Sequence, residues 1–279
     1  EFKDKDYNEA ERWFREYVNL ETDKNSTTIV DAYNRLGDCR YMNSSYWQAI
    51  EYYDKVIELS KADVDYAYFQ KGFSLGLVDR PQRKIETLSE LASRFPGSAY
   101  IDDSYFEMGK SYVLLGNTAS ARDNYLKIIN DFEGSPYMSR ALVQLGLIDK
   151  NAGRNLEALE FYKKVVRDYP GSPEASNALK SIKDIYVNMD NVDGYLAYVE
   201  EIGQGVSRSE QDSLLYISAE NAYLAGNCEK AISSLKEYLE RFPNGSFLLN
   251  ANYYLADCLL KLNRGDEAYE SLLYIIDQP

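Results

Sequence analysis

The chain has 279 residues, with 31 lysines and arginines against 45 aspartates and glutamates, which gives a formal net charge of −14. Hydrophobic residues make up 45% and charged residues 27%, a balance that excludes wholesale disorder. The acidity argues against nucleic acid or an anionic membrane as the main partner, because both require a basic face. The absence of histidine excludes Ser-His-Asp and Cys-His nucleophiles and every His-ligated metal site.

In chain order, the pattern predicts a leading helix at about residues 6–20 and then helical hairpins that repeat every 35 to 37 residues or so. Each hairpin has a position in its first helix that is small in all but one case, Ile182. A second position, mostly alanine, follows twelve residues later, and a large residue comes four residues after that. Such spacing lets two helices approach closely and interlock. The first series is Gly37, Gly72, Gly109, Gly146, Ile182, Ala219 and Ala256; the second is Ala49, Lys84, Ala121, Ala158, Gly194, Ala231 and Ala268; the large residues are Tyr53, Leu88, Tyr125, Tyr162, Tyr198, Leu235 and Leu272.

Helical periodicity is clearest in residues 46–57, where the apolar spacing predicts that Trp47, Ile50, Tyr53, Val56 and Ile57 are buried. Glycines between the two small-residue series suit the turn inside each hairpin. These are Gly116, Gly153, Gly226 and Gly265.

A tetrad predicts the junction between successive hairpins. Its copies are Phe95-Pro96-Gly97-Ser98, Phe132-Glu133-Gly134-Ser135, Tyr169-Pro170-Gly171-Ser172 and Phe242-Pro243-Asn244-Gly245-Ser246. Proline and glycine end a helix, and we expect each serine to be the N-cap of the next helix. The tetrad is missing from the hairpin at about residues 175–207, where Gly203-Gln204-Gly205 replaces it. We therefore expect a change of curvature, or a hinge, near residues 203–208.

This pattern resembles the tetratricopeptide repeat (TPR), with Leu36-Gly37 and Leu145-Gly146 in first helices, Ala158 opening a second helix and Pro170 at the exit. The resemblance implies an all-α fold, an α-solenoid coiled into a right-handed superhelix of about seven hairpins plus a leading helix. It covers residues 1–279 as a single solenoid. Because the chain opens without an initiator methionine or an apolar leader, we expect a fragment of a longer protein.

The resemblance also implies that the first helices line the concave surface and bind a protein or peptide there. The inward-facing positions would be Asn34, Phe69, Phe106, Val143, Leu179, Tyr216 and Tyr253, followed by Asp38, Phe73, Lys110, Leu147, Lys183, Glu220 and Asp257. These positions do not repeat the lysine and asparagine pattern of TPR domains that grip a terminal carboxylate. A modest basic patch of Lys110, Arg140, Lys150 and Lys183 is the best candidate for an acidic partner segment, with ordinary solvated charges as the alternative.

The leading functional prediction is thus a non-catalytic interaction scaffold with a protein or peptide partner, no nucleic acid, no metal and no cofactor. The alternative is a carbohydrate-binding envelope protein that uses exposed tyrosines, such as Tyr52-Tyr53, Tyr66 with Tyr68, or Tyr253-Tyr254. An enzyme would need a convergent acid pair, and Asp102-Asp103 and Glu200-Glu201 are poor candidates because neighbouring helical residues point apart.

The tetrad also resembles the junctions of TPR proteins of the bacterial envelope, which implies a periplasmic or outer-membrane-associated location. No apolar run approaches the ~18 to 20 residues of a membrane span. The three cysteines, Cys39, Cys228 and Cys258, leave two alternatives open: buried free thiols, or a Cys228–Cys258 bridge between neighbouring antiparallel helices.

Overall fold

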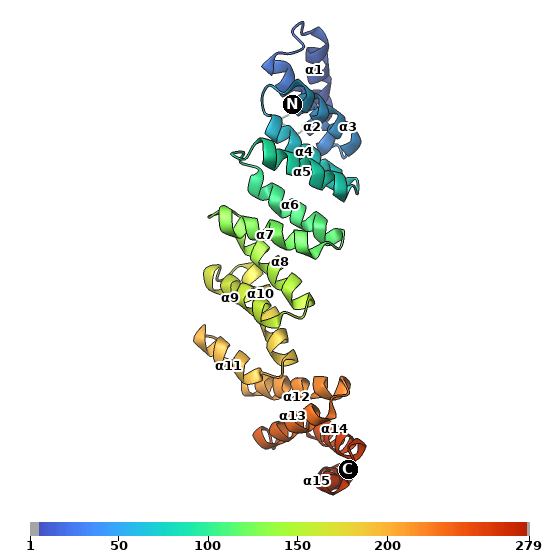
Figure 1. Ribbon diagram of the computed structural model, residues 1–279, viewed down its shortest axis with the longest axis vertical. Coiled ribbons are helices and arrows are strands. Elements are labelled where there is room, and N and C mark those ends of the chain that lie inside the picture. The colour runs from blue at the N-terminus through green and yellow to red at the C-terminus, as the bar shows by residue number, and fades with distance from the viewer. Residues whose placement is uncertain (1–5, 278–279) are drawn as a thin grey trace. The chain divides into compact units, whose positions relative to one another are not determined.

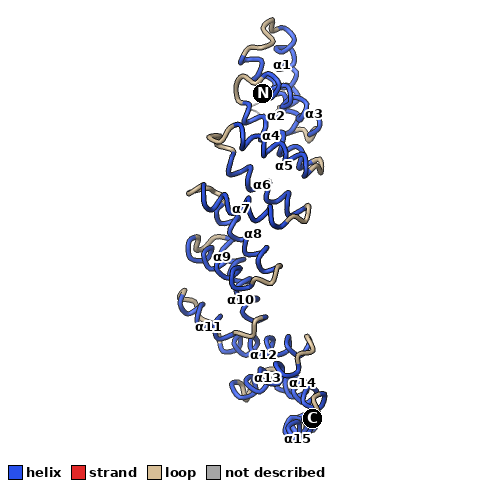
Figure 2. Tube along the Cα trace, viewed as in Figure 1, coloured by secondary structure: helices blue, strands red, loops and turns tan. Residues whose placement is uncertain are grey.

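Fifteen α-helices and no strands make up residues 6–277, the part of the chain that this computed structural model describes (Figures 1 and 2). The chain divides into two compact units, Glu1–Gly153 and Arg154–Pro279. The first unit contains α1 (Tyr7–Leu20), α2 (Thr27–Met42), α3 (Tyr46–Leu59), α4 (Val64–Leu77), α5 (Pro81–Arg94), α6 (Ile101–Leu114), α7 (Thr118–Asp131) and α8 (Met138–Asn151). The second contains α9 (Asn155–Asp168), α10 (Pro173–Asn188), α11 (Val192–Glu201), α12 (Arg208–Leu224), α13 (Cys228–Arg241), α14 (Leu248–Lys261) and α15 (Gly265–Ile276).

Within each unit, helices pack mainly against the helices that precede and follow them in the sequence (Figure 1). We call α2 and every second helix after it the A helices, and α1, α3 and the remaining helices the B helices. One leading helix followed by seven A–B pairs is the predicted order, and packing between sequence neighbours defines a solenoid. The all-α solenoid prediction is confirmed, whereas the hand of the superhelix and a single solenoid over residues 1–279 stay predictions.

Glycines of the first small-residue series lie against the large residue of the same hairpin. A Cβ added to Gly37 would lie 2.5 Å from Tyr53 Cε1, and one added to Gly109 would lie 2.6 Å from Tyr125 Cε1. Both tyrosines are fully buried, so their rings have no room to withdraw. The predicted interlock of small and large residues is therefore confirmed in these hairpins.

Tyr53 and Tyr125 hold equivalent places, but only one of them has a partner for its hydroxyl. Tyr53 donates to Asp38 Oδ1 at 2.9 Å, whereas Tyr125 Oη is buried without a hydrogen-bond partner. We expect Tyr53→Phe to lower the free energy of unfolding by about 2 kcal/mol, because it removes a hydrogen bond to a charged group. Tyr125→Phe should raise it by about 1 kcal/mol, because it removes an unpaired buried oxygen. Urea unfolding followed by circular dichroism checks both, and a loss of stability in Tyr125→Phe would contradict this account.

Every turn from an A helix to a B helix contains one residue in the left-handed conformation that suits a helix C-terminus. These residues are Ser44, Asp79, Gly116, Gly153, Asp190, Gly226 and Asn263. The prediction that Gly265 forms its turn was wrong. Gly265 is the first residue of α15, and Asn263 takes the left-handed conformation instead, with φ of 57°.

The turn geometry predicts different costs for the same substitution at two glycines. Neither Gly116 nor Gly97 has a heavy atom within 4 Å of an added Cβ, but only Gly116 has a positive φ, of 74°. We expect Gly116→Ala to cost about 1 kcal/mol of the free energy of unfolding, through backbone strain alone. Gly97→Ala is the matched control and should be neutral or slightly stabilising. Equal midpoints of urea unfolding for the two variants would refute the explanation.

Two junction serines bind the preceding hairpin instead of capping the next helix. Ser98 Oγ donates to Asp65 Oδ2 at 2.6 Å, and Ser135 Oγ donates to Asp102 Oδ2 at 2.7 Å. The helices that follow begin three residues after these serines, so the N-cap prediction was wrong at both places. It was also wrong at Ser246, because Phe247 is the N-cap of α14. Ser172 is an N-cap as predicted, and accepts the amide of the residue three positions later at 3.0 Å.

The fifth A–B pair, α10–α11, departs from the others, as its sequence suggested. Its B helix, α11, has 10 residues where most B helices have 14, and α12 packs on α10 as well as on α11. Asp190, in the turn, accepts hydrogen bonds from Ser218 Oγ and Ser234 Oγ, both at 2.7 Å. Polar contacts thus connect the fifth A–B pair to the sixth, α12–α13. The change of curvature near residues 203–208 stays a prediction.

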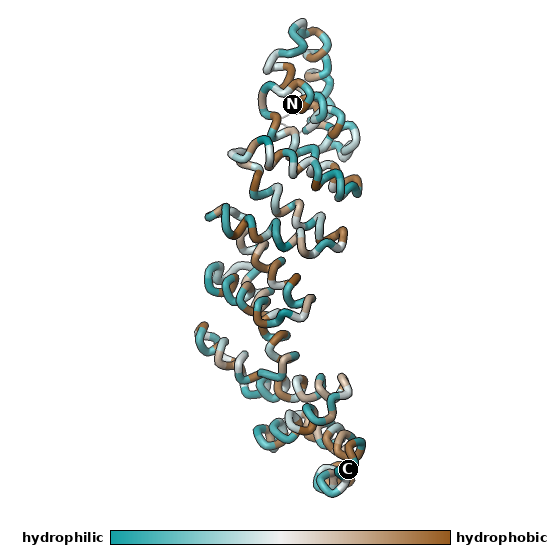
Figure 3. Tube along the Cα trace, viewed as in Figure 1, coloured by the Kyte–Doolittle hydropathy of each residue, from teal (hydrophilic) through white to brown (hydrophobic). Residues whose placement is uncertain are grey.

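Hydrophobic residues recur along the helices at the spacing of a buried face (Figure 3). In α3, Ile50, Tyr53 and Val56 are buried as predicted, but Trp47 is 47% exposed, with Arg80 over its ring. The prediction for Trp47 was wrong because it lies six residues before Tyr53. At about 100° per residue, the two side chains are about 120° apart around the helix.

Candidate functional site

All fourteen residues of the predicted partner-binding series lie on A helices, two on each. The eight residues from Asn34 to Leu147 belong to the first unit, and the six from Leu179 to Asp257 belong to the second. Their surroundings differ widely, from full burial to open solvent. The structure therefore separates residues that hold the hairpins together from residues that remain available to a partner.

Three aromatic members of the series stack on the junction that leads into the next A helix. Phe69 stacks on Tyr100 with ring centroids 5.0 Å apart, Phe106 on Tyr137 at 4.8 Å, and Tyr216 on Phe247 at 4.3 Å. Phe106 and Tyr216 are buried as a result. These rings fasten one hairpin to the next. A role for the junction aromatics Tyr100, Tyr137 and Phe247 was not predicted from the sequence. Their recurrence one or two residues after the tetrad serines could have indicated it.

Asp38 is the centre of a polar cluster that joins α2, α3 and α4. Its carboxylate accepts hydrogen bonds from Tyr53 Oη at 2.9 Å and Tyr66 Oη at 2.6 Å, and pairs with Arg35 at 3.2 Å. Burial raises the pKa of Asp38, although all three donors favour the charged form. Because its carboxylate oxygens already have partners in the protein, Asp38 stabilises the packing of α2, α3 and α4.

A cleft of about 320 Å³ lies beside this cluster, and we call it the Asn34 cleft. Asn34 is only 2% exposed, and its Oδ1 is buried without a hydrogen-bond partner. Buried polar atoms in folded proteins almost always have a partner, so this acceptor needs an explanation. The cleft is lined by Asp31, Asn34, Arg35, Asp63, Tyr66 and Tyr100.

A second cleft, of about 360 Å³, contains two further members of the series, Phe73 and Lys110, and we call it the Lys84 cleft. Its lining is Phe73, Gly76, Leu77, Pro81, Lys84, Glu107, Lys110, Ser111 and Leu114. The Lys84 ammonium pairs with Glu107 and lies 5.5 Å from the centroid of the Phe73 ring.

Two lysines share the single carboxylate of Glu107 in the Lys84 cleft. Lys84 is 7% exposed, and Lys110, which is exposed, contacts Glu107 Oε1 at 2.8 Å. Burial alone would raise the pKa of Glu107, but hydrogen bonds from Lys110 and Lys84 bring it below its ordinary value. Lys84 stands where most hairpins have alanine. The sequence showed that departure but gave no reason to place it in a site.

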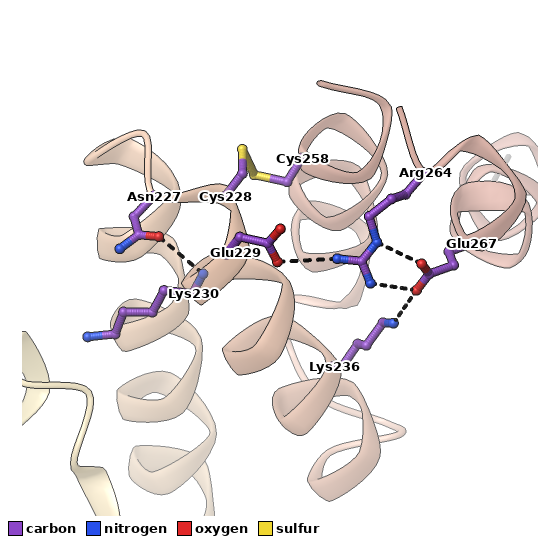
Figure 4. A network of polar contacts seen from close by, with 8 residues as sticks. All are labelled: Asn227, Cys228, Glu229, Lys230, Lys236, Cys258, Arg264 and Glu267. Carbon is purple, nitrogen blue, oxygen red and sulfur yellow. Dashed lines mark hydrogen bonds and ion pairs between the residues drawn. A yellow bond between two sulfur atoms is a disulfide. The ribbon is translucent and has the colours of Figure 1, made fainter. Parts of the chain in front are cut away.

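In the second unit, most residues of the series already have partners. Tyr216 Oη donates to Glu220 at 2.7 Å, Lys183 pairs with Glu210 at 3.5 Å, and Asp257 accepts from Tyr223 Oη at 2.9 Å. A hydrogen bond from Lys261 lowers the pKa of Asp257. Tyr253 is 55% exposed and is the most open member of the series in this unit. Figure 4 shows a separate polar network nearby, around Arg264 and the Cys228–Cys258 disulfide.

The basic patch and the acid pairs do not form isolated charged sites. Lys110 and Lys183 are paired with carboxylates, and they lie in different units. Asp102 accepts a hydrogen bond from Ser135, and Asp103 accepts one from Tyr137. These acids therefore support the junction between hairpins.

Residues 6–277 contain no group of three or more cysteines, aspartates and glutamates placed to hold a metal ion. In the same range, none of the helices combines the length and the apolar content that crossing a bilayer requires.

Comparison with known proteins agrees with this architecture. Models of the tetratricopeptide repeat match residues 103–135, 140–172 and 218–278. A tetratricopeptide repeat protein from Parabacteroides merdae ATCC 43184 is 14% identical, covers 92% of this chain and 94% of its own, and has a TM-score of 0.54. MamA is 22% identical over 64% of this chain and 94% of its own, with a TM-score of 0.52. YrrB, described as a TPR protein with an unusual peptide-binding site, is 16% identical over 80% and 97%, with a TM-score of 0.50.

None of the curated proteins matches the sequence. At these levels of identity, the solved structures establish the fold alone. Together with the matched models, they show that this chain contains tetratricopeptide repeats within a fold shared with tetratricopeptide-repeat structures.

Proposed function

We propose that this chain is a non-catalytic scaffold that binds a protein or peptide segment along the A helices of its first unit. The observation that carries the proposal is the unpaired Oδ1 of Asn34 beside a polar cleft of about 320 Å³. A peptide in extended conformation offers a free backbone N–H at every residue except proline, and such a donor would satisfy this acceptor.

The Lys84 cleft supports the same proposal and suggests the charge of the partner. It contains two ammonium groups against one carboxylate, and its wall includes the Phe73 ring and the apolar side chains of Leu77 and Leu114. An acidic side chain beside an apolar one would suit this lining. Peptide binding by the structural neighbour YrrB is in keeping with this proposal.

A random peptide library displayed on phage tests the proposal with a defined ligand. An enriched peptide would be synthesised, and its Kd measured by fluorescence anisotropy for the wild type, Asn34→Ala and Lys110→Gln. We expect each variant to bind about tenfold more weakly, which corresponds to one lost hydrogen bond or ion pair.

Gln82→Ala is the control, because Gln82 is exposed on α5 and lines neither cleft. It should bind like the wild type. Peptides that bind Asn34→Ala and Lys110→Gln as tightly as the wild type would place the binding site elsewhere.

A second candidate function, carbohydrate binding, is favoured by Tyr253 alone. Of the tyrosine clusters that the sequence suggested, Tyr53 and Tyr68 are buried, and Tyr66 Oη is bound to Asp38. Tyr253 presents an exposed ring that contacts Tyr254 edge to face, with centroids 5.8 Å apart. A glycan array would show binding that Tyr253→Ala abolishes, and an empty array would remove this candidate.

A further inference from the structure

The second unit contains a cleft of about 370 Å³ between two B helices, α9 and α11, and we call it the α9–α11 cleft. It belongs to the second unit, whereas both clefts of the proposed function belong to the first, and it shares no lining residue with them. It occurs beside the irregular fifth A–B pair, α10–α11, where α11 is short. Its lining is Glu160, Phe161, Lys163, Lys164, Arg167, Tyr198, Glu201 and Ile202.

Two lysines of this cleft have no counter-ion among the described residues. Lys163 is half-buried: its Nζ donates to Tyr186 Oη at 2.9 Å and lies 4.8 Å from the centroid of the Tyr198 ring. Neither Lys163 nor Lys164, which is also half-buried, pairs with a carboxylate in residues 6–277. Acidic residues outnumber basic ones in this chain, so two half-buried ammonium groups without a carboxylate are unexpected.

Tyr198 adds a buried hydroxyl that has no hydrogen-bond partner. It is 7% exposed, and its Oη is buried with no hydrogen bond. Burial, and then the nearby charge of Glu201, raises the pKa of Tyr198 to about 12. The hydroxyl therefore keeps its proton at neutral pH and is available as a donor.

We propose that the α9–α11 cleft binds the phosphate monoester group of a small molecule, held by Lys163, Lys164 and the Tyr198 hydroxyl. A phosphate monoester carries a charge of about −1.5 to −2 at pH 7 and three strong acceptor oxygens, which match two ammonium groups and one hydroxyl donor. A carboxylate would leave one ammonium group uncompensated. The remaining volume lies beside Phe161 and Ile202, which suits an apolar substituent on the phosphate.

The other charges of the cleft set the expected strength of binding. Arg167 is already paired with Asp168, at 2.8 Å between Nε and Oδ1. Glu160 and Glu201 are exposed and would oppose an anion. We therefore expect modest affinity, which Glu201→Gln should increase several-fold by removing a like charge beside the phosphate.

Titration calorimetry with phenyl phosphate tests the proposal, with benzoate as a singly charged probe of similar shape. We expect Tyr198→Phe, Lys163→Gln and Lys164→Gln each to weaken phenyl phosphate binding by about tenfold. Benzoate should bind the wild type at least about tenfold more weakly than phenyl phosphate does. Phenyl phosphate should also raise the melting temperature of the wild type more than that of Tyr198→Phe.

The chain offers matched controls for both kinds of substitution. Tyr125→Phe removes another buried, unpaired hydroxyl, and Lys55→Gln removes a cation that also lies over two tyrosine rings, each at 5.1 Å. Both should bind phenyl phosphate like the wild type. Equal binding by Tyr198→Phe and the wild type, equal binding of benzoate and phenyl phosphate, or no binding of phenyl phosphate below about 10 mM would each overturn the proposal.

Discussion

Replacing Glu107 by leucine is expected to lower the free energy of unfolding by about 3–5 kcal/mol, the largest effect of any single substitution considered for this chain. Glu107 is the ion-pair partner of Lys84, and both residues are 7% exposed. Without that carboxylate, the Lys84 ammonium is left buried beside Gly76 and the Phe73 ring, with no negative charge to offset its lost hydration. Urea unfolding at pH 7 measures the loss.

A double variant distinguishes two causes of the lost stability: a buried Lys84 ammonium without a counter-ion, and lost packing around Glu107. Lys84→Ala restores the residue that most hairpins have at this place, and leaves Glu107 paired with exposed Lys110. We expect Lys84→Ala with Glu107→Leu to recover most of the stability that Glu107→Leu loses alone. If the double variant is no more stable than Glu107→Leu, the stranded lysine is not the cause.

The same pair predicts how stability depends on pH. Because the pKa of Glu107 is lowered in the folded state, its contribution is complete above the unfolded value of about 4.3 and is lost as the pH falls through the folded value. Wild-type stability should therefore fall more steeply below about pH 4.3 than that of the double variant. Urea unfolding at pH 7 and in mild acid compares the two slopes.

Removing the Cys228–Cys258 disulfide is expected to cost about 3–4 kcal/mol of the free energy of unfolding, because the bridge closes a loop of 30 residues. The bond joins α13 to α14, whose Cα atoms at the two cysteines are 5.0 Å apart. This settles the alternative that the sequence left open in favour of a bridge. Ion pairs from Arg264 to Glu229 and Glu267 lie in the same region but are solvent-exposed, so they contribute little (Figure 4).

Unfolding of Cys228→Ser with Cys258→Ser, compared with the oxidised wild type, measures this contribution. Cys39→Ala is the control, because Cys39 is a free, buried thiol and its loss leaves the bridge intact. Reductant should destabilise the wild type and Cys39→Ala alike, and leave the double variant unchanged. A double variant as stable as the oxidised wild type would show that the bridge contributes nothing.

The disulfide also bears on where the protein works. Structural disulfides persist mainly in oxidising compartments. We propose, with the envelope-like junctions as the first reason and the bridge as the second, that the protein acts in the bacterial periplasm or at the outer membrane. Alkylation of thiols in intact cells, followed by gel-shift analysis, would find Cys228 and Cys258 protected there, and modification of both would contradict the proposal.

The spacing of small and large residues in the sequence was enough to predict the hairpin architecture. The order of helices follows from the spacing of Gly37, Ala49 and Tyr53 and their counterparts, because small and large residues at fixed intervals favour close packing of the two helices of a hairpin. The junctions were less predictable. Ser98 and Ser172 occupy the same position in two copies of the tetrad, yet only Ser172 caps a helix. The Ser98 hydroxyl instead donates a hydrogen bond to the Asp65 carboxylate.

The sequence by itself determined the repeat, the helices and the set of positions on the A helices from which a binding surface would be made. Only the tertiary structure decided which of those positions are free, because a side chain's partners come from other hairpins. Asp38 is engaged by tyrosines of α3 and α4, whereas Asn34, one turn earlier on the same helix, keeps an unpaired oxygen. The unpartnered hydroxyl of Tyr198, and the lack of a carboxylate beside Lys163, could not be predicted from hydrophobic periodicity for the same reason. Both depend on which residues of other helices lie nearby.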